Sequence, residues 1–390
     1  MKGTLTVSTQ KMPEADRDAL VRACDAEIYF TAAWQTAWWN HYGADWSRSR
    51  TPLTLVVRDG TRTVAVLPFC IERFWPALTL ARLAGVDTNF AVVGLPIMAG
   101  YEVEVMAAVL GYLTKEAGVD VISFAPLSQR APALVPLRKA VTAVPALRLY
   151  RDRSTREHTL LDLPESTDAF VGALSKSRRR EYRRDMKRLT AGAPVTARSF
   201  ETDDVAEAMD RFVAQHQAQW AAQGKNGHFG DWPKAEGFYR ALLTRLAPEG
   251  AAGLDEIWHG DRMISSQLRF NLGPKAYWWL NARAIDPDYA KVGLGRVALV
   301  ERIDGLVRAG IRTVDAGAGV YEYKQAYGGT PVPVHEVLIG KSAASLRLKV
   351  MTAWADLLHL LYYRIWFLKL APRLRVPRGP LLRTWVRSRI

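Results

Sequence analysis

The chain has 390 residues, of which 49% are hydrophobic, so it is long enough for two ordinary domains with apolar cores. Its formal net charge is +14, and two short segments account for more than this excess. Residues 341–390 contain eleven Lys or Arg and one acid, and residues 176–188 contain eight and two. The rest is close to neutral, which excludes a uniformly basic nucleic-acid coat protein.

The two cysteines and the N-terminus narrow the class of protein further. Cys24 and Cys70 have no metal-ligand spacing, so we expect no metal site and no disulfide framework. The first twenty residues contain no apolar run long enough for a signal peptide, which predicts a protein that stays in the cytoplasm.

The first part of the chain alternates helical and extended patterns. A helix is predicted near 14–24, and a second follows in "FTAAWQTAWWNHYG". Asp59-Gly60 separates two apolar runs, which indicates a hairpin. A strand near "AVVGL", a helix that stops at Gly118 and the strand "VDVISFAPL" complete a predicted N-terminal unit, residues 1–150.

The second part repeats this order and is predicted as another α/β unit, residues 151–345. Its predicted elements are helices over 165–190, 203–222 and 233–247, the strand "PVTARSF", three strands over 254–285, a helix over 293–310, and the strands "RTVD" and "PVPVHEVLIG". The predicted fold class is therefore mixed α/β (α+β), with two related units that each carry a mixed sheet.

The stretch "YAKVGLGRVAL" follows a strand and opens a helix. Backbone N–H groups and the helix dipole at such a point suit a pyrophosphate, and two glycines allow close approach. The candidate cofactor-binding residues are Lys291, Val292, Gly293, Leu294, Gly295 and Arg296. The alternative is a helix start whose glycines serve only packing.

This stretch resembles the acyl-CoA pyrophosphate loop of the GNAT N-acyltransferases, although Ala290 stands where that family usually has Gln or Arg. A second stretch, "IRTVDAGAGVYEYKQAYGG", resembles the closing motif of CelD-type acyltransferases and FemAB-type transferases. Such proteins contain two GNAT-like halves, and HfsK-type polysaccharide acyltransferases share the plan. The resemblance implies two tandem GNAT-like units and acetyl-CoA or another acyl-CoA as donor, with no metal.

Direct acyl transfer to an amine needs a group that orients or deprotonates the amine and donors for the oxyanion. We assign catalytic roles to Asp315, Tyr323 and Lys324, which match the closing motif; Lys324 is expected to hold an acceptor phosphate or stabilise negative charge. The alternatives are a cap of the glycine turn for Asp315 and a solvated lysine. The candidate substrate-binding residues are Gln267, Trp279, Asn281, His228 and Tyr327; strand alternation predicts Trp279 and Asn281 on one face.

The basic segment 176–188 is predicted to be a helix that meets an anionic partner. Arg179 and Arg183 share one helical face and can grip phosphates or a guanine edge, as in cyclic di-GMP receptors. A solvated charged face is the simpler interpretation.

The tail, residues 346–390, combines an apolar helical face with many cations, including Trp354, Leu357, Leu361 and Ile365, and ends near Trp385. It predicts a basic amphipathic helix that binds an anionic inner-membrane surface. A helix packed on the protein body is the alternative.

Taken with the resemblance, these features predict an acyl-CoA-dependent N-acyltransferase that acetylates an amino sugar of a cell-surface polysaccharide or its lipid-linked precursor. The protein is expected to be cytoplasmic and peripherally membrane-associated. The first alternative is a FemAB-like transferase that uses aminoacyl-tRNA. The second is a cyclic-di-GMP-responsive membrane-associated scaffold.

Overall fold

The computed structural model describes residues 3–43, 50–74, 78–86, 90–202, 204–232 and 234–378, apart from the side chains of Phe74 and Thr155. The chain forms two compact units that interleave along the sequence. Unit 1 comprises residues 1–158, 332–370 and 381–390, and unit 2 comprises residues 159–331 and 371–380.

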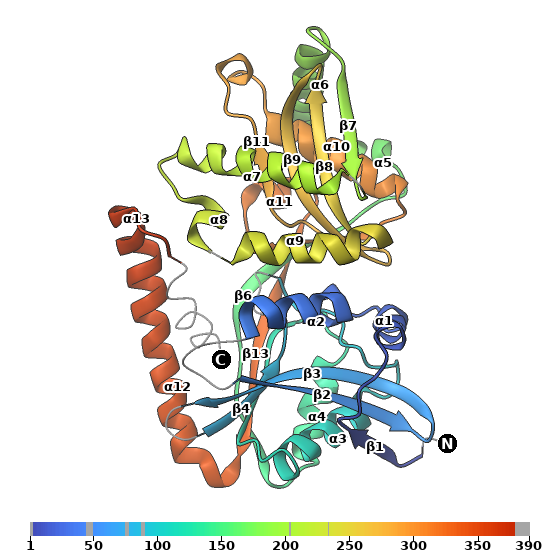
Figure 1. Cartoon of the computed structure of the whole chain (residues 1–390), viewed down its shortest axis with the longest axis vertical. Coiled ribbons are helices and arrows are strands. Elements are labelled where there is room, and N and C mark those ends of the chain that lie inside the picture. The colour runs from blue at the N-terminus through green and yellow to red at the C-terminus, as the bar shows by residue number, and fades with distance from the viewer. Residues whose placement is uncertain are drawn as a thin grey trace. The chain divides into compact units, whose positions relative to one another are not determined.

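Unit 1 is built on a mixed sheet with the strand order β1-β2-β3-β4-β5-β13-β6 (Figure 1). Neighbouring strands are antiparallel from β1 to β4, β4 and β5 are parallel, and β5 and β13 are antiparallel. Its strands are β1 (Leu5–Ser8), β2 (Arg50–Asp59), β3 (Arg62–Phe74), β4 (Leu78–Leu83), β5 (Val121–Ser128), β6 (Leu147–Asp162) and β13 (Thr330–Lys341). Its helices are α1 (Glu14–Ala23), η1 (Ile28–Phe30), α2 (Ala32–Trp38), η2 (Trp39–Gly43), α3 (Glu102–Lys115), α4 (Leu134–Thr142), η5 (Ser342–Ala344), α12 (Ser345–His359) and η6 (Leu360–Leu370).

Most elements predicted for this region are present. The hairpin turns at Gly60, whose φ of 57° lies in the left-handed region that favours glycine. "AVVGL" is the exception: within it only Val92 makes an isolated bridge, to Leu127, because the segment runs as an irregular buried connection. Strand β6 was missed, since its charged sequence "RLYRDRSTREH" lacks a clear apolar alternation.

Within unit 2 the strands of the mixed sheet are ordered β6-β12-β10-β9-β8-β7, with β11 paired to β9. Its strands after β6 are β7 (Val195–Phe200), β8 (Ala252–His259), β9 (Arg262–Leu272), β10 (Lys275–Tyr277), β11 (Asn281–Arg283) and β12 (Thr313–Ala318). Its helices are α5 (Thr167–Ala173), α6 (Lys176–Thr190), α7 (Val205–Ala221), α8 (Gly227–Asp231), α9 (Ala235–Leu246), η3 (Ala247–Glu249), η4 (Pro287–Tyr289), α10 (Leu294–Arg308), α11 (Glu322–Ala326) and α13 (Ala371–Leu374). Figure 1 shows α7 and α9 on one face of this sheet and α10 on the other.

The mixed α/β prediction is confirmed, but the division of the chain differs from a cut near residue 150. Strand β6 runs through that position and continues to Asp162, and the units divide after His158. Strand β13, predicted to close the second unit, belongs to unit 1 from Val332 onward because it pairs with β5. The long-range pairing of β13 therefore overrides its place in the sequence.

The predicted C-terminal helix is present as α12 and continues with wider turns through η6. One face packs on unit 1, where Leu348, Met351 and Ala355 join a core cluster with residues of β4, β5 and β13. This packing matches the alternative of a helix packed on the protein body. The opposite face exposes large apolar side chains, and its contact with a membrane surface stays a prediction. Trp385 and the rest of 379–390 lie outside the described residues.

Candidate functional site: the opening between β11 and β12

The pairing of two strands in unit 2 stops abruptly. β10 and β12 run parallel and pair from Lys275–Thr313 to Tyr277–Asp315, and the last contact is Trp278 N–H to the Asp315 carbonyl at 2.7 Å. Beyond it β11 pairs with β9 instead, while β12 continues to Ala318. Because ligands in open α/β sheets bind where strands part at their carboxyl ends, this opening is the candidate site.

The break between β10 and β11 reverses the predicted alternation. Trp279 packs against Phe270 and Tyr239, with ring centroids 5.1 and 6.1 Å apart, on the α9 face. Asn281 lies directly opposite Gln267, which faces α10, so these two side chains share that face. Trp279 and Asn281 therefore lie on opposite faces, and the prediction of a common face is wrong.

Asp315 ends the paired part of β12 and holds the glycine turn. Its carboxylate is buried, and Oδ1 accepts a hydrogen bond of 2.8 Å from Gly317 N–H. Gly317 and Gly319 have φ values of 76° and 91°, which side chains rarely tolerate. The contact matches the capping role that was the alternative for Asp315.

Lys324 lies under the same turn, not at an exposed rim. Its Nζ donates to the carbonyls of Gly317, Ala318 and Gly319 at 3.2, 3.0 and 3.4 Å, and the residue is 3% exposed. Burial lowers the pKa of Lys324 to about 8, although the charge of Asp315 opposes the shift. The expectation that Lys324 faces an acceptor phosphate is not met here, because three backbone carbonyls already take its hydrogen bonds.

The two tyrosines of the closing motif have different surroundings. Tyr323 is 47% exposed, stacks on Tyr321 at 5.9 Å and meets the edge of Trp278 at 6.1 Å, so it flanks the opening. Tyr327 is buried in the core cluster around α10, and its hydroxyl has no hydrogen-bond partner among the described residues. Of the two, Tyr323 is the one that a substrate can reach.

The start of α10, the predicted pyrophosphate cradle, already holds an anion from the chain. Asp185 of α6 accepts from Gly293 N–H at 3.2 Å and from Arg296 Nη2 at 2.6 Å. Arg296 also reaches Glu181 at 2.7 Å. Asp185 is fully buried, and although burial alone would raise its pKa, Arg296 and Gly293 lower it overall. A carboxylate thus occupies the position that the dipole of α10 favours for phosphate.

The other cradle residues serve this junction. Val292 and Leu294 pack in the cluster between α6 and α10, Gly295 is exposed, and the Lys291 carbonyl accepts from Arg188 at 2.7 Å. The prediction of a free backbone cradle at residues 291–296 therefore fails in this conformation. A sequence signal existed, because Glu181 and Asp185 are the two acids of the basic helix and share one helical face.

The remaining candidates lie apart from the opening. His228 lies in α8 and contacts the Tyr239 hydroxyl at 3.1 Å. Burial lowers the pKa of His228 to about 3, so it does not take up a proton near neutrality. Arg179 donates to the Leu174 carbonyl at 2.8 Å and to Gly172, which engages its guanidinium. Arg183 is exposed. Within the described residues no group of three His, Cys, Asp or Glu could hold a metal.

The Lys324 tether predicts a loss of stability on substitution. Lys324→Met removes three hydrogen bonds from an ammonium group, so we expect the free energy of unfolding to fall by about 2 kcal/mol in urea denaturation. Lys291→Met, at an exposed cation, is the matched control and should change stability little. Equal free energies of unfolding for the two variants would show that the hydrogen bonds of Lys324 do not stabilise the turn.

The lowered pKa of Lys324 predicts a pH effect of definite sign. Between about pH 8 and the ordinary lysine pKa of 10.5, the unfolded chain binds this proton more than the folded chain does. Wild-type stability should therefore rise relative to Lys324→Met as the pH increases through this window. A constant difference between their unfolding free energies over the same window would show that the pKa is not lowered.

Comparisons with known proteins bear on the family and the fold of the chain. Residues 176–325 match the family model described as an acetyltransferase (GNAT) domain, and no curated protein matches. The structure of FemX has 10% identity and a TM-score of 0.62, with 84% of this chain and 96% of that chain covered. L-PGS from Bacillus licheniformis has 9% identity and a TM-score of 0.51, with 85% and 92% covered. These likenesses concern the fold, and the family match relates residues 176–325 to GNAT-type acetyltransferase domains.

Proposed function

We propose that the protein is an N-acyltransferase that moves an acyl group from acyl-CoA to an amino group, in particular that of an amino sugar in a cell-surface polysaccharide or its lipid-linked precursor. The observation that carries the proposal is the opening between β11 and β12 inside the GNAT-type domain. We infer that the acyl group enters there, because β10 and β12 no longer pair beyond Tyr277 and Asp315.

In this reaction the acceptor nitrogen attacks the thioester carbonyl, the C–N bond forms, the C–S bond breaks and the thiolate leaves. The amine proton must pass to a base or to solvent. Asp315 and Lys324 act as positioning residues, because both hold the glycine turn that ends β12. Tyr323 and Trp278 border the opening, where a flat aromatic surface suits a sugar ring.

If acyl-CoA is the donor, its phosphates must bind at the start of α10, where Asp185 lies. A pyrophosphate at the start of α10 would face a buried carboxylate that is already paired with Arg296. Acyl-CoA can bind there only if Asp185 withdraws with α6, which would leave Arg296 free to pair with the phosphates instead.

The cations of α6 support a second candidate, a transferase that takes its acyl group from aminoacyl-tRNA. Helix α6 exposes a row of cations: Lys176, Arg180, Arg183, Arg184, Lys187 and Arg188. Several exposed cations on one helix suit the phosphate backbone of a nucleic acid. The FemAB-type resemblance implies this donor class.

Calorimetry with acetyl-CoA, aminoacyl-tRNA and cyclic di-GMP distinguishes the candidates. If acetyl-CoA is the donor, Asp185→Asn should bind it more tightly than the wild type, by roughly tenfold, because one buried negative charge no longer opposes the phosphates. Asp168→Asn, at the exposed start of α5, is the control and should leave the affinity unchanged.

The outcomes are distinct. No heat with acetyl-CoA from either the wild type or Asp185→Asn, together with binding of aminoacyl-tRNA, would replace the first candidate by the second. Binding of cyclic di-GMP alone would favour the scaffold.

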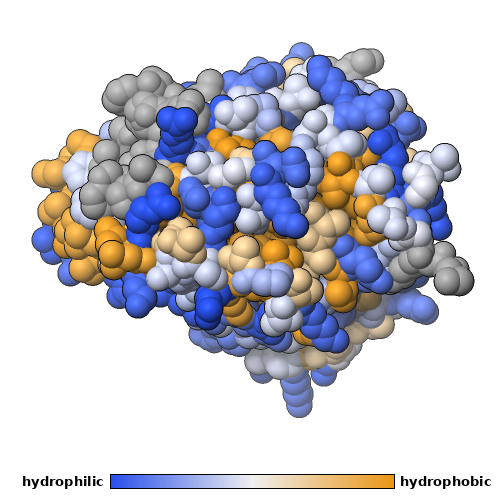
Figure 2. Space-filling model, turned by 90° about the horizontal axis from the view of Figure 1, so that it is seen from below, coloured by the Kyte–Doolittle hydropathy of each residue, from blue (hydrophilic) through white to orange (hydrophobic). Residues whose placement is uncertain are grey.

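We further propose that α12 and η6 bring the protein to an anionic membrane surface. Their outer face exposes Trp354, Leu357, Leu361, Ile365 and Leu368, each at least 39% accessible, and apolar surface gathers on that side in Figure 2. Exposed Lys349, Arg364 and Lys369 flank this face. Among the described residues no helix is long and apolar enough to cross a bilayer, whereas this combination suits an interfacial helix.

Vesicle co-sedimentation tests the membrane proposal. Leu357→Gln with Leu361→Gln should reduce binding to phosphatidylglycerol vesicles by at least tenfold, because two apolar side chains no longer enter the interface. Val135→Gln with Leu149→Gln changes two equally exposed apolar side chains elsewhere in unit 1 and should bind as the wild type. Equal sedimentation of both double variants would refute the assignment.

A further inference from the structure

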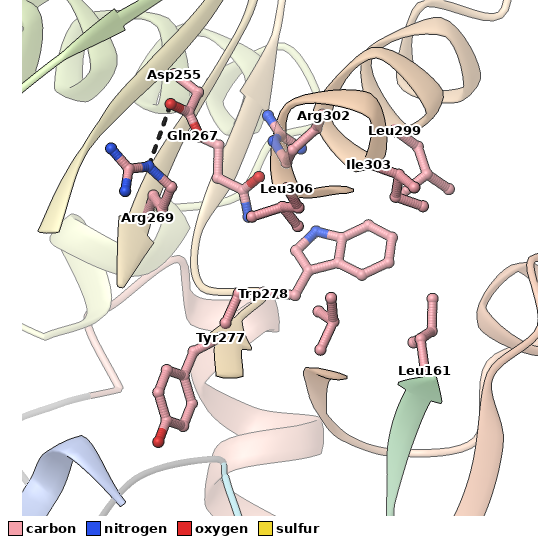
Figure 3. A pocket seen from close by; sticks show the side chains of 12 residues that line it. Leu161, Asp255, Gln267, Arg269, Tyr277, Trp278, Leu299, Arg302, Ile303 and Leu306 are labelled. Carbon is pink, nitrogen blue, oxygen red and sulfur yellow. Dashed lines mark hydrogen bonds and ion pairs between the residues drawn. The ribbon is translucent and has the colours of Figure 1, made fainter. Parts of the chain in front are cut away.

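A small cavity lies in unit 2 between the sheet and α10, beside the opening. Figure 3 shows Gln267 from β9 and Arg302 from α10 converging on it, with the indole of Trp278 below them. Its remaining lining is largely apolar and includes Leu161, Leu299 and Leu306. The polar side chains of Gln267 and Arg302 therefore meet at one end of a cavity whose remaining lining is largely apolar.

Arg302 brings a positive charge to this point without a matching acid. Its Nε and Nη2 atoms are shielded from solvent and have no hydrogen-bond partner among the described residues. Asp255 is the acid in the lining, but it accepts from Arg269 Nε at 3.3 Å and from Ser199 at 2.9 Å. Arg302 as a whole is half-buried, but shielded N–H donors without an acceptor are costly, so an additional acceptor for Nε and Nη2 is expected.

Two further buried groups have no partner. Trp278 Nε1 is a donor, and Gln267 Oε1 belongs to a side chain that is 2% exposed. A half-turn of the Gln267 amide would present its NH2 group to the same point, because the two amide orientations fill nearly the same space. Arg302, Trp278 and Gln267 together would then offer N–H donors from three directions.

The size of the cavity selects among acceptors. The centre of a water-sized particle has about 20 Å³ to move in, so the cavity has room for at least one small ligand. The largely apolar lining disfavours strongly hydrated anions such as sulfate and phosphate. We propose that the cavity binds one small monovalent anion, of which chloride is the natural example, with Arg302 as its charge partner.

The electrostatics of Arg302 agree with this assignment. Burial lowers its pKa to about 10, and Asp255 offsets the shift only in part. An anion in contact with the guanidinium would stabilise the charged form and fasten the middle of α10 to β9 and β10. Anion binding should therefore stabilise the folded chain by mass action, in proportion to the logarithm of its concentration.

Thermal unfolding at equal ionic strength in sodium chloride, sodium bromide and sodium gluconate tests the site. Relative to gluconate, both halides should raise the midpoint of the wild type by a few degrees. Arg302→Met should lose this difference. Arg308→Met, at the exposed end of the same helix, should keep it. The same halide response in the wild type and in Arg302→Met would overturn the proposal and leave a buried water in the cavity.

A second measurement covers the case in which Arg302→Met does not fold. Chloride NMR relaxation on the wild type should show line broadening that bromide competes away and that falls severalfold in Trp278→Phe, which keeps the bulk of the side chain but removes Nε1–H. Broadening that is unchanged in Trp278→Phe, or absent from the wild type, would contradict an anion at this position.

Discussion

The pairing of β10 with β12, and its end at Tyr277 and Asp315, is the constraint on which the rest of unit 2 depends. Below that point the two strands share a ladder and support the core around α10. Above it one strand returns to β9 and the other turns back through two glycines. The candidate site, the buried tether of Lys324 and the cavity beside Arg302 all border this single break in the sheet.

Two buried charged contacts hold the glycine turn after β12 and the start of α10. Lys324 fixes the glycine turn through three carbonyls, and Asp185 fixes the start of α10 through Gly293 and Arg296. Removal of one partner from such a contact leaves a buried charge or unmet donors, so each is costly to disturb. Their roles differ: Lys324 completes a turn of the backbone, whereas Asp185 places a carboxylate where the dipole of α10 favours an anion.

The sequence predicted elements better than contacts. Apolar periodicity and turn residues located α7, α9, α10 and the hairpin of unit 1, because these signals are local. The closing motif drew attention to Asp315 and Lys324, yet their hydrogen bonds depend on how the turn folds back on itself. Asp185 and Arg302 were missed as site residues, since each acquires its role from a segment distant in the chain. The break at Trp278 was likewise hidden in an apolar run that reads as one strand.

Hydrogen exchange tests whether the acyl donor binds in the opening of the unit 2 sheet. The measurement compares the free protein with the protein saturated by whichever donor, acetyl-CoA or aminoacyl-tRNA, binds in calorimetry. When the donor is bound, the backbone amides on both borders of the opening, residues 278–283 and 316–321, are expected to exchange more slowly. Unchanged exchange in both segments, despite donor binding, would contradict binding of the donor in the opening.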